Sequence, residues 1–286
     1  MTSDCIGQTR GMDGIGLAFD EVAELYDRVR PRYPAALFDD VATLTGAEKG
    51  ARVLEVGCGP GQATGDLLAR GWHVHAVEPG VAMAARARDN FAGRPFTVDL
   101  AKFDDWDPPG TFDMLFSATA YHWVAPDVRW PLAAAVLEPG GALVLTTNRT
   151  VAGGEFHEVN RASADLHARH APEIEFGLSS AAETIIDEVS ERRHDIGAVW
   201  ELAETKSGPS RAGALFEPPE IRTYEWSVAY DTADAIALLR TYSPYLRVPP
   251  ERRSRLLDGI ADIIRDEFGG MVTRRYLAVL AVAKRR

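Results

Sequence analysis

The chain has 286 residues, of which 46% are hydrophobic and 26% charged, a balance typical of a globular protein. Its 42 acidic and 31 basic residues give a net charge of −11, which argues against a nucleic-acid or anionic-membrane surface. We expect neither a signal peptide nor a membrane span, because no apolar stretch has the required length. Only Cys5 and Cys58 occur, so we expect no disulfide framework and a cytoplasmic location.

The first half of the chain alternates between strand and helix patterns. Residues 1–16 are predicted to be a disordered tail, and two short helical patterns separated by Pro31 and Pro34 follow. Apolar, strand-like runs then alternate with helical runs that end at glycine or proline. The predicted strands are 51–56, 72–80, 94–103, 111–117 and 142–148. Five alternating units over about 100 residues indicate an α/β protein with a doubly wound, mostly parallel sheet.

The regular alternation of strand and helix patterns ends after Asn148. Residues 149–219 contain two helical patterns joined by polar and Pro/Gly segments, whereas 220–231 and 272–286 read as strands with two helices between them. We therefore predict one sheet of seven strands and divide the chain into four segments. These are the tail 1–16, a cofactor-binding core with a helical cover (17–148), a helical insertion that forms a substrate lid (149–219), and the completion of the sheet (220–286).

A glycine-rich loop, "VLEVGCGPG", closes the first predicted strand. Gly57, Gly59 and Gly61 let the backbone turn tightly and approach a ligand closely. In a parallel sheet this loop lies at the carboxyl edge, where such folds bind ligands. The dinucleotide fingerprint G-x-G-x-x-G/A does not fit, because its third position would be Gln62 or Thr64. The loop thus indicates a ligand other than a pyrophosphate.

"VLEVGCGPG" resembles the first motif of class I S-adenosylmethionine-dependent methyltransferases, a family with a Rossmann-like sheet. In that family the loop packs against the methionine part of the cofactor, and the strand acid orders the loop and the ammonium group. A carboxylate near a cationic amino group and a sulfonium is favourable electrostatically. The resemblance implies S-adenosylmethionine as cofactor and assigns to its methionine part Glu55, Gly57, Cys58, Gly59 and Gly61.

Glu78 ends the second predicted strand and is followed by Pro79. Its position matches the family acid that accepts hydrogen bonds from both ribose hydroxyls, a task that suits a carboxylate. A simpler interpretation is an acid near the N-terminus of the next helix. The resemblance favours the ribose, with Pro79 beside it.

"KFDDWDPPGTFDMLFSATAYHWVAP" resembles the trans-aconitate-methyltransferase-like branch of the family. The resemblance implies that Phe103 and Asp104 border the adenine, with Asp99 as the rival for the acidic contact. It also places His122 and Trp123 at the reaction centre. The backbones of two further residues would lie beside the cofactor, Ser117 and Ala118.

The N-terminal "YDRVRPRYP" resembles a segment that lies over the cofactor pocket in the same branch. It assigns Tyr26, Arg30 and Tyr33 to the cofactor, although packing of Tyr26 and solvation of Arg30 would explain these residues without a ligand. The resemblance therefore extends the expected site to the helical cover that precedes the first strand.

Three residues of "TYSPYLRVPP" suit an anionic or flat acceptor, namely Tyr242, Tyr245 and Arg247. The same residues could equally pack the insertion onto the sheet, and the sequence leaves both alternatives open.

Two histidine pairs have spacings that merit a metal hypothesis. His73 and His75 share a strand face, and His167 and His170 share a helix face. No third ligand is placed by the sequence for the first pair. For the second pair, Glu173 and Glu175 follow closely, but surface histidines among acids are the commoner pattern. We expect no metal.

These patterns predict an enzyme that transfers a methyl group from S-adenosylmethionine to a small molecule. O-methylation of a carboxyl or hydroxyl group is favoured by the branch resemblance, with N- and C-methylation open. His122 is the candidate general base or substrate-orienting group. Two alternatives are an NAD-dependent dehydrogenase on a similar sheet and a cofactor-binding module without catalysis.

Overall fold

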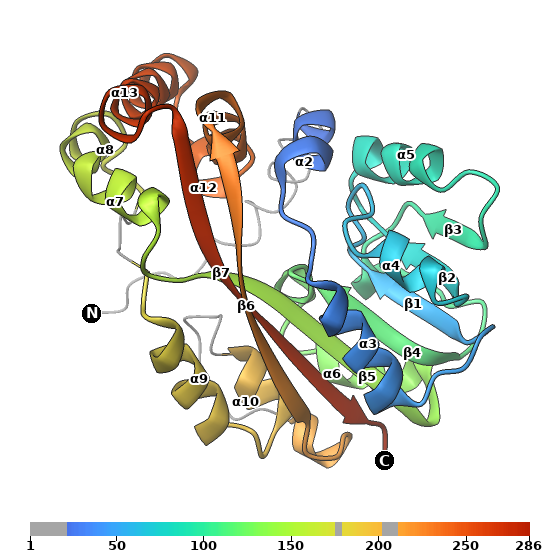
Figure 1. Ribbon diagram of the computed structural model, residues 1–286. Helices are drawn as coiled ribbons and strands as arrows, with labels where there is room; N and C mark the ends of the chain where they lie inside the picture. Colours follow the sequence, from blue (N-terminus) through green and yellow to red (C-terminus); the bar gives the residue numbers. More distant parts are fainter. Residues whose placement is uncertain (1–21, 175–178, 202–210) are drawn as a thin grey trace, which may run out of the picture.

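The computed structural model describes residues 22–174, 179–201 and 211–286, so the expected tail lies outside the described residues. One sheet has the strand order β3-β2-β1-β4-β5-β7-β6 (Figure 1). All neighbours are parallel except that β7 runs antiparallel to both β5 and β6. The seven-stranded, mostly parallel sheet predicted from the sequence is confirmed. Its strands are β1 (Arg52–Val56), β2 (His73–Val77), β3 (Phe96–Asp99), β4 (Phe112–Ala118), β5 (Leu137–Thr150), β6 (Glu220–Asp231) and β7 (Met271–Lys284).

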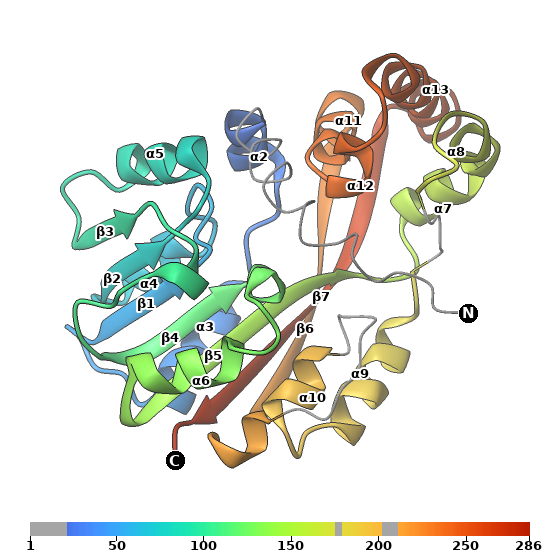
Figure 2. The ribbon, with the colours of Figure 1, turned by 180° about the vertical axis from the view of Figure 1, so that it is seen from behind.

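Helices cover both faces of the sheet because its inner strands are apolar on both sides (Figures 1 and 2). In β1, Val53 packs into the cluster beneath one helical layer, and its neighbour Leu54 packs into the cluster on the opposite face. The first layer contains α3 (Ala35–Thr45), α4 (Thr64–Ala69) and α5 (Val81–Asn90). The second contains α6 (Arg129–Val136), α9 (Ala182–Glu191) and α10 (Ile196–Glu201).

A separate apolar cluster forms where β6 and β7 extend beyond the rest of the sheet. Residues such as Tyr230 on β6 and Val272 on β7 pack there against the surrounding helices, which we call the helical subdomain. Its helices are α2 (Ala23–Val29), α7 (Glu155–Ala162), α8 (Ala164–His170), α11 (Thr232–Arg240), α12 (Ser243–Leu246) and α13 (Pro250–Phe268). The segment predicted as one insertion is thus divided, since α7 and α8 join this subdomain whereas α9 and α10 cover the sheet.

Short 3-10 turns complete the described fold, namely η2 (Phe103–Asp105), η3 (Tyr121–Trp123) and η4 (Ala212–Ala214). None of the described helices combines the length and the apolar character that crossing a membrane requires. The longest, α13, has 19 residues but many charged side chains, several of which are exposed.

Strand lengths create a recess at the carboxyl edge of the sheet. β4 pairs with β5 only as far as Ala118 opposite Thr146, whereas β5 continues to Thr150 beside β7. Beyond Thr146 one edge of β5 therefore has no strand neighbour in the sheet. Side chains from either face of β5 can reach the space beside that edge. The candidate functional site lies in this recess.

Candidate active site

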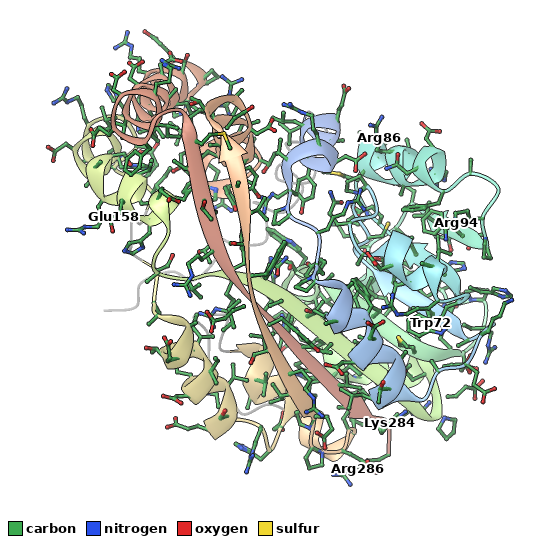
Figure 3. The ribbon with its side chains drawn as sticks, viewed as in Figure 1. Trp72, Arg86, Arg94, Glu158, Lys284 and Arg286 are labelled. Atoms are coloured by element: carbon green, nitrogen blue, oxygen red, sulfur yellow. The ribbon has the colours of Figure 1, made fainter. Side chains whose placement is uncertain are left out.

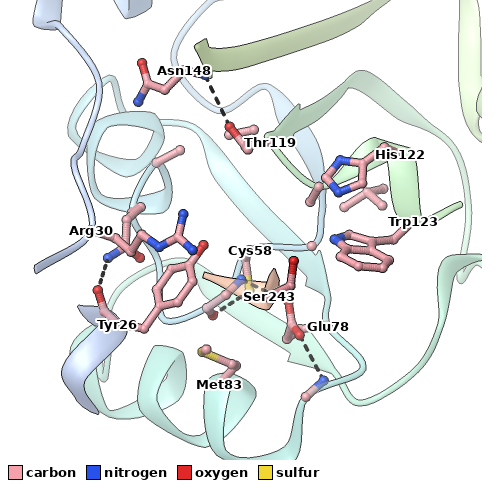
Figure 4. A pocket seen from close by; sticks show the side chains of 18 of the residues that line it. Tyr26, Arg30, Cys58, Glu78, Met83, Thr119, His122, Trp123, Asn148 and Ser243 are labelled. Carbon is pink, nitrogen blue, oxygen red and sulfur yellow. Dashed lines mark hydrogen bonds between the residues drawn. The ribbon is translucent and has the colours of Figure 1, made fainter. Parts of the chain in front are cut away.

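A cavity of about 890 Å³ lies at the carboxyl edge, between the glycine loop, the ends of β2, β4 and β5, and the helical subdomain (Figure 4). Fifteen of the nineteen residues that the sequence nominated line its wall, although their roles stay predictions. These are Tyr26, Arg30, Tyr33, Glu55, Gly57, Cys58, Gly59, Glu78, Pro79, Phe103, Asp104, Ala118, His122, Trp123 and Tyr242. The structure does not bring the other four to the wall, namely Gly61, Ser117, Tyr245 and Arg247.

The glycines of the loop have different tasks. Gly57 has φ +72°, and a Cβ there would lie 2.4 Å from the Cβ of Ala120. Gly61 has φ +105°, and a Cβ would lie 2.2 Å from Cε2 of Phe91. Gly61 thus serves the packing of the loop against α5 and does not contact the cavity, in contrast to the expectation. Gly59 has open space around its missing Cβ and offers its backbone to the cavity.

Glu55 is a buried carboxyl at the end of β1. Its Oε2 accepts a hydrogen bond of 2.6 Å from Oγ1 of Thr64, which begins α4. Burial, with a smaller contribution from the nearby Glu78, raises the pKa of Glu55 to about 7 against the effect of this hydrogen bond. The carboxyl lies on the cavity wall with no cationic partner among the described residues. A bound cation would stabilise its ionised form.

Glu78 spans the gap between two loops (Figure 4). Its Oε2 accepts from the amide of Gly59 at 2.9 Å, and its Oε1 accepts from the amide of Gly80 at 2.9 Å. A carboxylate oxygen can accept more than one hydrogen bond. The acid therefore fixes the loops after β1 and β2 in one geometry and offers acceptors to the cavity between them.

Cys58 presents a thiol that stays protonated. Its Sγ–H donates to the carbonyl of Gly59 at 3.3 Å, and the residue is buried. Burial raises the pKa of the Cys58 thiol well above its ordinary value, and Glu55 and Glu78 raise it further. A nucleophilic role is therefore disfavoured, because the thiolate is the reactive species.

Only one of the two candidate adenine acids lies on the cavity. Asp104, on η2, lines the wall and accepts from the amide of Ala125 at 3.2 Å. Asp99 is held elsewhere by His75 at 2.9 Å and by the indole of Trp106 at 2.8 Å. These bonds lower the pKa of Asp99, the bond from Trp106 most strongly. Geometry thus favours Asp104, and His75 is engaged with a carboxylate.

His122 and Trp123 lie on η3, with ring centroids 4.8 Å apart, and both are exposed toward the cavity (Figure 4). The protein around the His122 ring, together with Arg129, lowers the pKa of His122 to about 4. The imidazole is therefore neutral at neutral pH and can accept or donate one hydrogen bond at each nitrogen according to its tautomer.

The segment around α2 covers the cavity and is tied to its surroundings. The guanidinium of Arg30 donates to Oγ1 of Thr241 at 2.8 Å and to its carbonyl at 2.7 Å. The same guanidinium lies 4.7 Å from the ring centre of Tyr26 and 4.0 Å from that of Tyr242. Arg30 thus joins the cover to the helical subdomain as well as lining the cavity.

The turn after β4 holds a strained residue that the sequence did not nominate. Thr119 has φ +55°, which is costly for a β-branched residue, and no other described non-glycine residue has positive φ. Its Oγ1 shares a 2.7 Å hydrogen bond with the hydroxyl of Tyr33 and accepts from the amide of Asn148. Ala118 beside it lines the cavity, whereas Ser117 is buried and donates to the carbonyl of Val56.

Of the three lid residues, only Tyr242 reaches the cavity. Tyr245 is buried in the helical subdomain, where its hydroxyl lies 2.8 Å from Nε2 of His167. Packing is thus the alternative that the structure supports for Tyr245. Arg247 is exposed and does not line the cavity.

The histidines considered as metal ligands have other partners or gather too few neighbours. His167 also contacts the carbonyl of Ser163 through Nδ1, and Glu173 beyond it pairs with Arg252. Glu175 lies outside the described residues. Within the described ranges no three histidine, cysteine or acidic side chains gather in a way that could hold a metal ion.

Sequence reasoning missed the far half of the cavity wall. This part of the wall comes from the end of β5, the loop that precedes α9 and the start of β7. It includes Asn148, Arg149, Ser180, Arg274 and Tyr276. The ligand-edge rule for parallel sheets could have indicated Asn148 and Arg149, which end β5. Arg274 and Tyr276 carried no signal, because their antiparallel strand starts at the edge where the parallel strands end.

Comparison with known proteins agrees with this geometry. Residues 53–141, from β1 to the turn before the buried part of β5, match the family described as "Methyltransferase domain". That range contains the glycine loop, Glu55 and Glu78, and the structure carries them at the expected edge of a methyltransferase-like sheet. Residues 53–141 are therefore similar in sequence to a methyltransferase domain.

Proteins similar to this part of the chain are named as methyltransferases. An uncharacterised methyltransferase of Mycobacterium bovis is 37% identical over 136 residues, which cover 47% of this chain and 53% of the relative. A trans-aconitate 2-methyltransferase of Rhodopseudomonas palustris is 34% identical over 98 residues, covering 33% of this chain and 37% of that protein. The chain thus spans about half the length of the first relative and less of the second.

Similarity in fold extends beyond the matched domain. The structure of a type II methyltransferase candidate from Anaeromyxobacter dehalogenans superposes with a TM-score of 0.57, at 23% identity, over 88% of this chain and 97% of that chain. The sheet and its flanking helices are therefore shared with a solved methyltransferase fold.

Proposed function

We propose that the protein is an S-adenosylmethionine-dependent methyltransferase that acts on a small molecule in the cytoplasm. The observation that carries the proposal is the convergence of Glu55, Gly59 and Glu78 on one cavity at the carboxyl edge of the sheet. The methyltransferase domain supplies the family context. The dehydrogenase alternative is not favoured, because neither the glycine spacing nor the domain match supports it.

The charges of this end of the cavity fit the proposed cofactor. Two carboxyl groups, Glu55 and Glu78, border the glycine loop, and Glu55 has no cationic partner among the described residues. An ammonium group beside them would be stabilised, since opposite charges favour each other's ionised forms. The diphosphate of a nicotinamide dinucleotide would instead be repelled by the same acids. Residue chemistry thus separates the two cofactors.

Bound S-adenosylmethionine would supply an electrophilic methyl group for transfer to a lone pair of the acceptor, with the thioether as the leaving group. The protein contributes binding, orientation and exclusion of water. Glu55, Glu78 and Asp104 are proposed to hold the cofactor, and the cover formed by Tyr26 and Arg30 to shield it. None of these tasks requires a strong base.

His122 is proposed to orient the acceptor. Its pKa of about 4 makes the imidazole a weak base, but it is neutral at physiological pH and therefore does not repel a sulfonium. A neutral imidazole can accept a hydrogen bond from an acceptor hydroxyl and remove its proton as the new bond forms. A carboxylate acceptor would require no such base, and O-methylation of either group is the preferred reaction on the branch resemblance.

Calorimetry with S-adenosylhomocysteine and with NAD⁺ tests the cofactor assignment. We expect the first to bind and the second to give no heat. Glu78→Gln should weaken S-adenosylhomocysteine by about tenfold or more, because hydrogen bonds to a charged group are lost. Glu138→Gln, an exposed acid on the opposite edge, is the matched control and should not change the affinity. Tight binding of NAD⁺ with no heat from S-adenosylhomocysteine would overturn the proposal.

Methyl transfer itself needs a second measurement, which separates an enzyme from a non-catalytic cofactor-binding module. Protein supplied with S-adenosylmethionine labelled at the methyl group is incubated with a panel of small carboxylic acids and alcohols. Label should appear in an organic product for at least one acceptor. Binding of the cofactor without transfer to any member of a broad panel would favour the module.

A further inference from the structure

Arg274 is a half-buried cation on the wall of the cavity, and one of its guanidinium nitrogens lacks an acceptor. Its side chain comes from β7 and lines the cavity. Nη1 is buried with no hydrogen-bond partner, and no ion pair to Arg274 occurs within the described ranges. An unsatisfied donor of a charged group is costly to bury. The position therefore calls for an acceptor that the described residues do not supply.

Aromatic rings hold this guanidinium in place. Its Cζ lies 4.5 Å from the ring centre of Phe156, 5.1 Å from that of Tyr242 and 5.8 Å from that of Tyr276. Rings at these distances attract a cation through their faces and limit its rotation. A guanidinium fixed in this way keeps its N–H groups directed for a ligand and loses little entropy on binding.

Arg149 provides a second cation on the same cavity. It lies near the end of β5, beyond the last residue that pairs with β4, so its side chain reaches the recess at the open edge. No hydrogen bond or ion pair of its guanidinium is found in the described part of the chain. Burial lowers the pKa of Arg149, with Glu188 acting in the opposite direction. The side chain nevertheless stays charged at neutral pH.

Other arginines near the cavity are engaged differently. Arg30 donates to Thr241 through both its Nε and Nη2 atoms, so its guanidinium already has acceptors. The cavity wall thus carries two acids next to the glycine loop, Glu55 and Glu78, and two arginines from β5 and β7, Arg149 and Arg274. The acids suit a cationic cofactor, and the arginines suit an anionic acceptor.

We propose that the methyl acceptor carries a carboxylate and that Arg274 binds this group, with Arg149 as a second cation on the wall of the same cavity. The inference rests on the proposed function and names the substrate class of the same site. A planar guanidinium matches a carboxylate through two parallel hydrogen bonds. The guanidinium withdraws electron density from the bound oxygens, so this carboxylate is an anchor and the methylated atom belongs to another group of the acceptor. The product therefore keeps a negative charge.

Binding measurements on protein saturated with S-adenosylhomocysteine test the anchor. The probes are succinate, glutarate, benzoate and 3-phenylpropanoate, each paired with the corresponding amide. At least one acid should bind about tenfold or more tightly than its amide, because the amide lacks the charge. Arg274→Met should remove this preference, and Arg274→Lys should restore part of it, because an ammonium keeps the charge but not the planar fork. Arg149→Met should reduce the preference to a smaller extent.

Controls separate failure of this inference from failure of the proposed function. Arg265→Met changes an exposed arginine paired with Asp262 on α13 and should leave acid binding intact. All variants should bind S-adenosylhomocysteine as the unaltered protein does, which also shows that they are folded. If no acid binds, or if Arg274→Met leaves the preference for acids unchanged, the anchor is wrong while the cofactor assignment stands. If S-adenosylhomocysteine itself does not bind, the proposed function fails first.

Discussion

The carboxyl group of Glu55 accepts a hydrogen bond of 2.6 Å from the hydroxyl of Thr64, and both side chains are buried. One hydroxyl does not replace the hydration that a carboxylate loses on burial, so the pKa of Glu55 rises to about 7. This relationship joins the end of β1 to the start of α4 and makes the charge of the site sensitive to pH.

Cofactor binding should strengthen as pH rises through about 7, because an ammonium group favours the ionised form of Glu55. Near pH 7 the free protein should therefore release up to about half a proton when S-adenosylhomocysteine binds. Calorimetry in buffers of different ionisation enthalpy measures this release. The variant Glu55→Gln keeps an acceptor for the hydroxyl of Thr64, but it should bind S-adenosylhomocysteine more weakly and without release of a proton. Equal proton release by this variant would show that another group titrates.

The same carboxyl affects stability with the opposite sign. Its pKa is higher in the folded protein than in the unfolded chain, so ionisation is favoured by unfolding. The contribution of Glu55 to the free energy of unfolding should fall as pH rises from about 4.5 to about 7 and stay constant above. Glu55→Gln should remove this dependence, whereas Glu138→Gln should not. Denaturant titrations of both variants across that pH range provide the measurement.

Gly61→Ala should destabilise the fold by about 2–4 kcal/mol, because a left-handed φ is combined with a contact against Phe91. Gly46→Ala is the matched control, since Gly46 has φ +67° but open space around the missing Cβ. It should cost only about 1 kcal/mol. Denaturant unfolding compares the two. Equal costs would mean that Phe91 moves aside freely and that the glycine serves conformation alone.

Ser117→Ala should lower the free energy of unfolding by about 1–3 kcal/mol and leave the affinity for S-adenosylhomocysteine nearly unchanged. The buried hydroxyl donates to the carbonyl of Val56 at 2.7 Å, and its side chain does not line the cavity. Ser190→Ala removes a similar bond on the exposed surface of α9 and should cost less than about 0.5 kcal/mol. A large loss of affinity in Ser117→Ala would place this residue in the binding machinery after all.

Asp27→Ala should loosen the cover of the cavity. The carboxylate of Asp27, on α2, accepts from Arg86 at 2.9 Å and from Asn90 at 3.1 Å, both on α5, and Figure 3 shows Arg86 at this junction. If the substitution destabilises the closed position of α2 by about 1 kcal/mol, S-adenosylhomocysteine should dissociate about fivefold faster than from the unaltered protein. Stopped-flow displacement measures the rate.

Asp262→Ala breaks an exposed ion pair on α13 and is the control for this change. Its dissociation rate should equal that of the unaltered protein. An unchanged rate in Asp27→Ala would mean that α2 does not limit release of the ligand.

Periodicity was sufficient to predict the sheet, and the motifs placed Glu55, the glycine loop and Glu78 at the edge of the sheet where the cavity lies. Each of these features is local, since Glu55 ends one strand, Glu78 ends the next, and the parallel arrangement brings both ends to one edge. The sequence also argued against a dinucleotide, because the spacing of the glycines can be read from nine consecutive residues. In these cases the sequence predicts the position in space, because each residue lies at or directly after the end of a strand.

The side of the cavity that we propose to bind the acceptor was decided by the tertiary structure alone. Arg149 lies next to the end of β5, a strand that extends beyond its neighbour β4, and Arg274 comes from an antiparallel strand more than 100 residues later. Tyr245, by contrast, has the residue type of a binding group but packs against His167 in the helical subdomain. Residue type and spacing specify what a side chain can do. Which side chains face one another depends on strand lengths and packing between distant segments, and no local pattern encodes that.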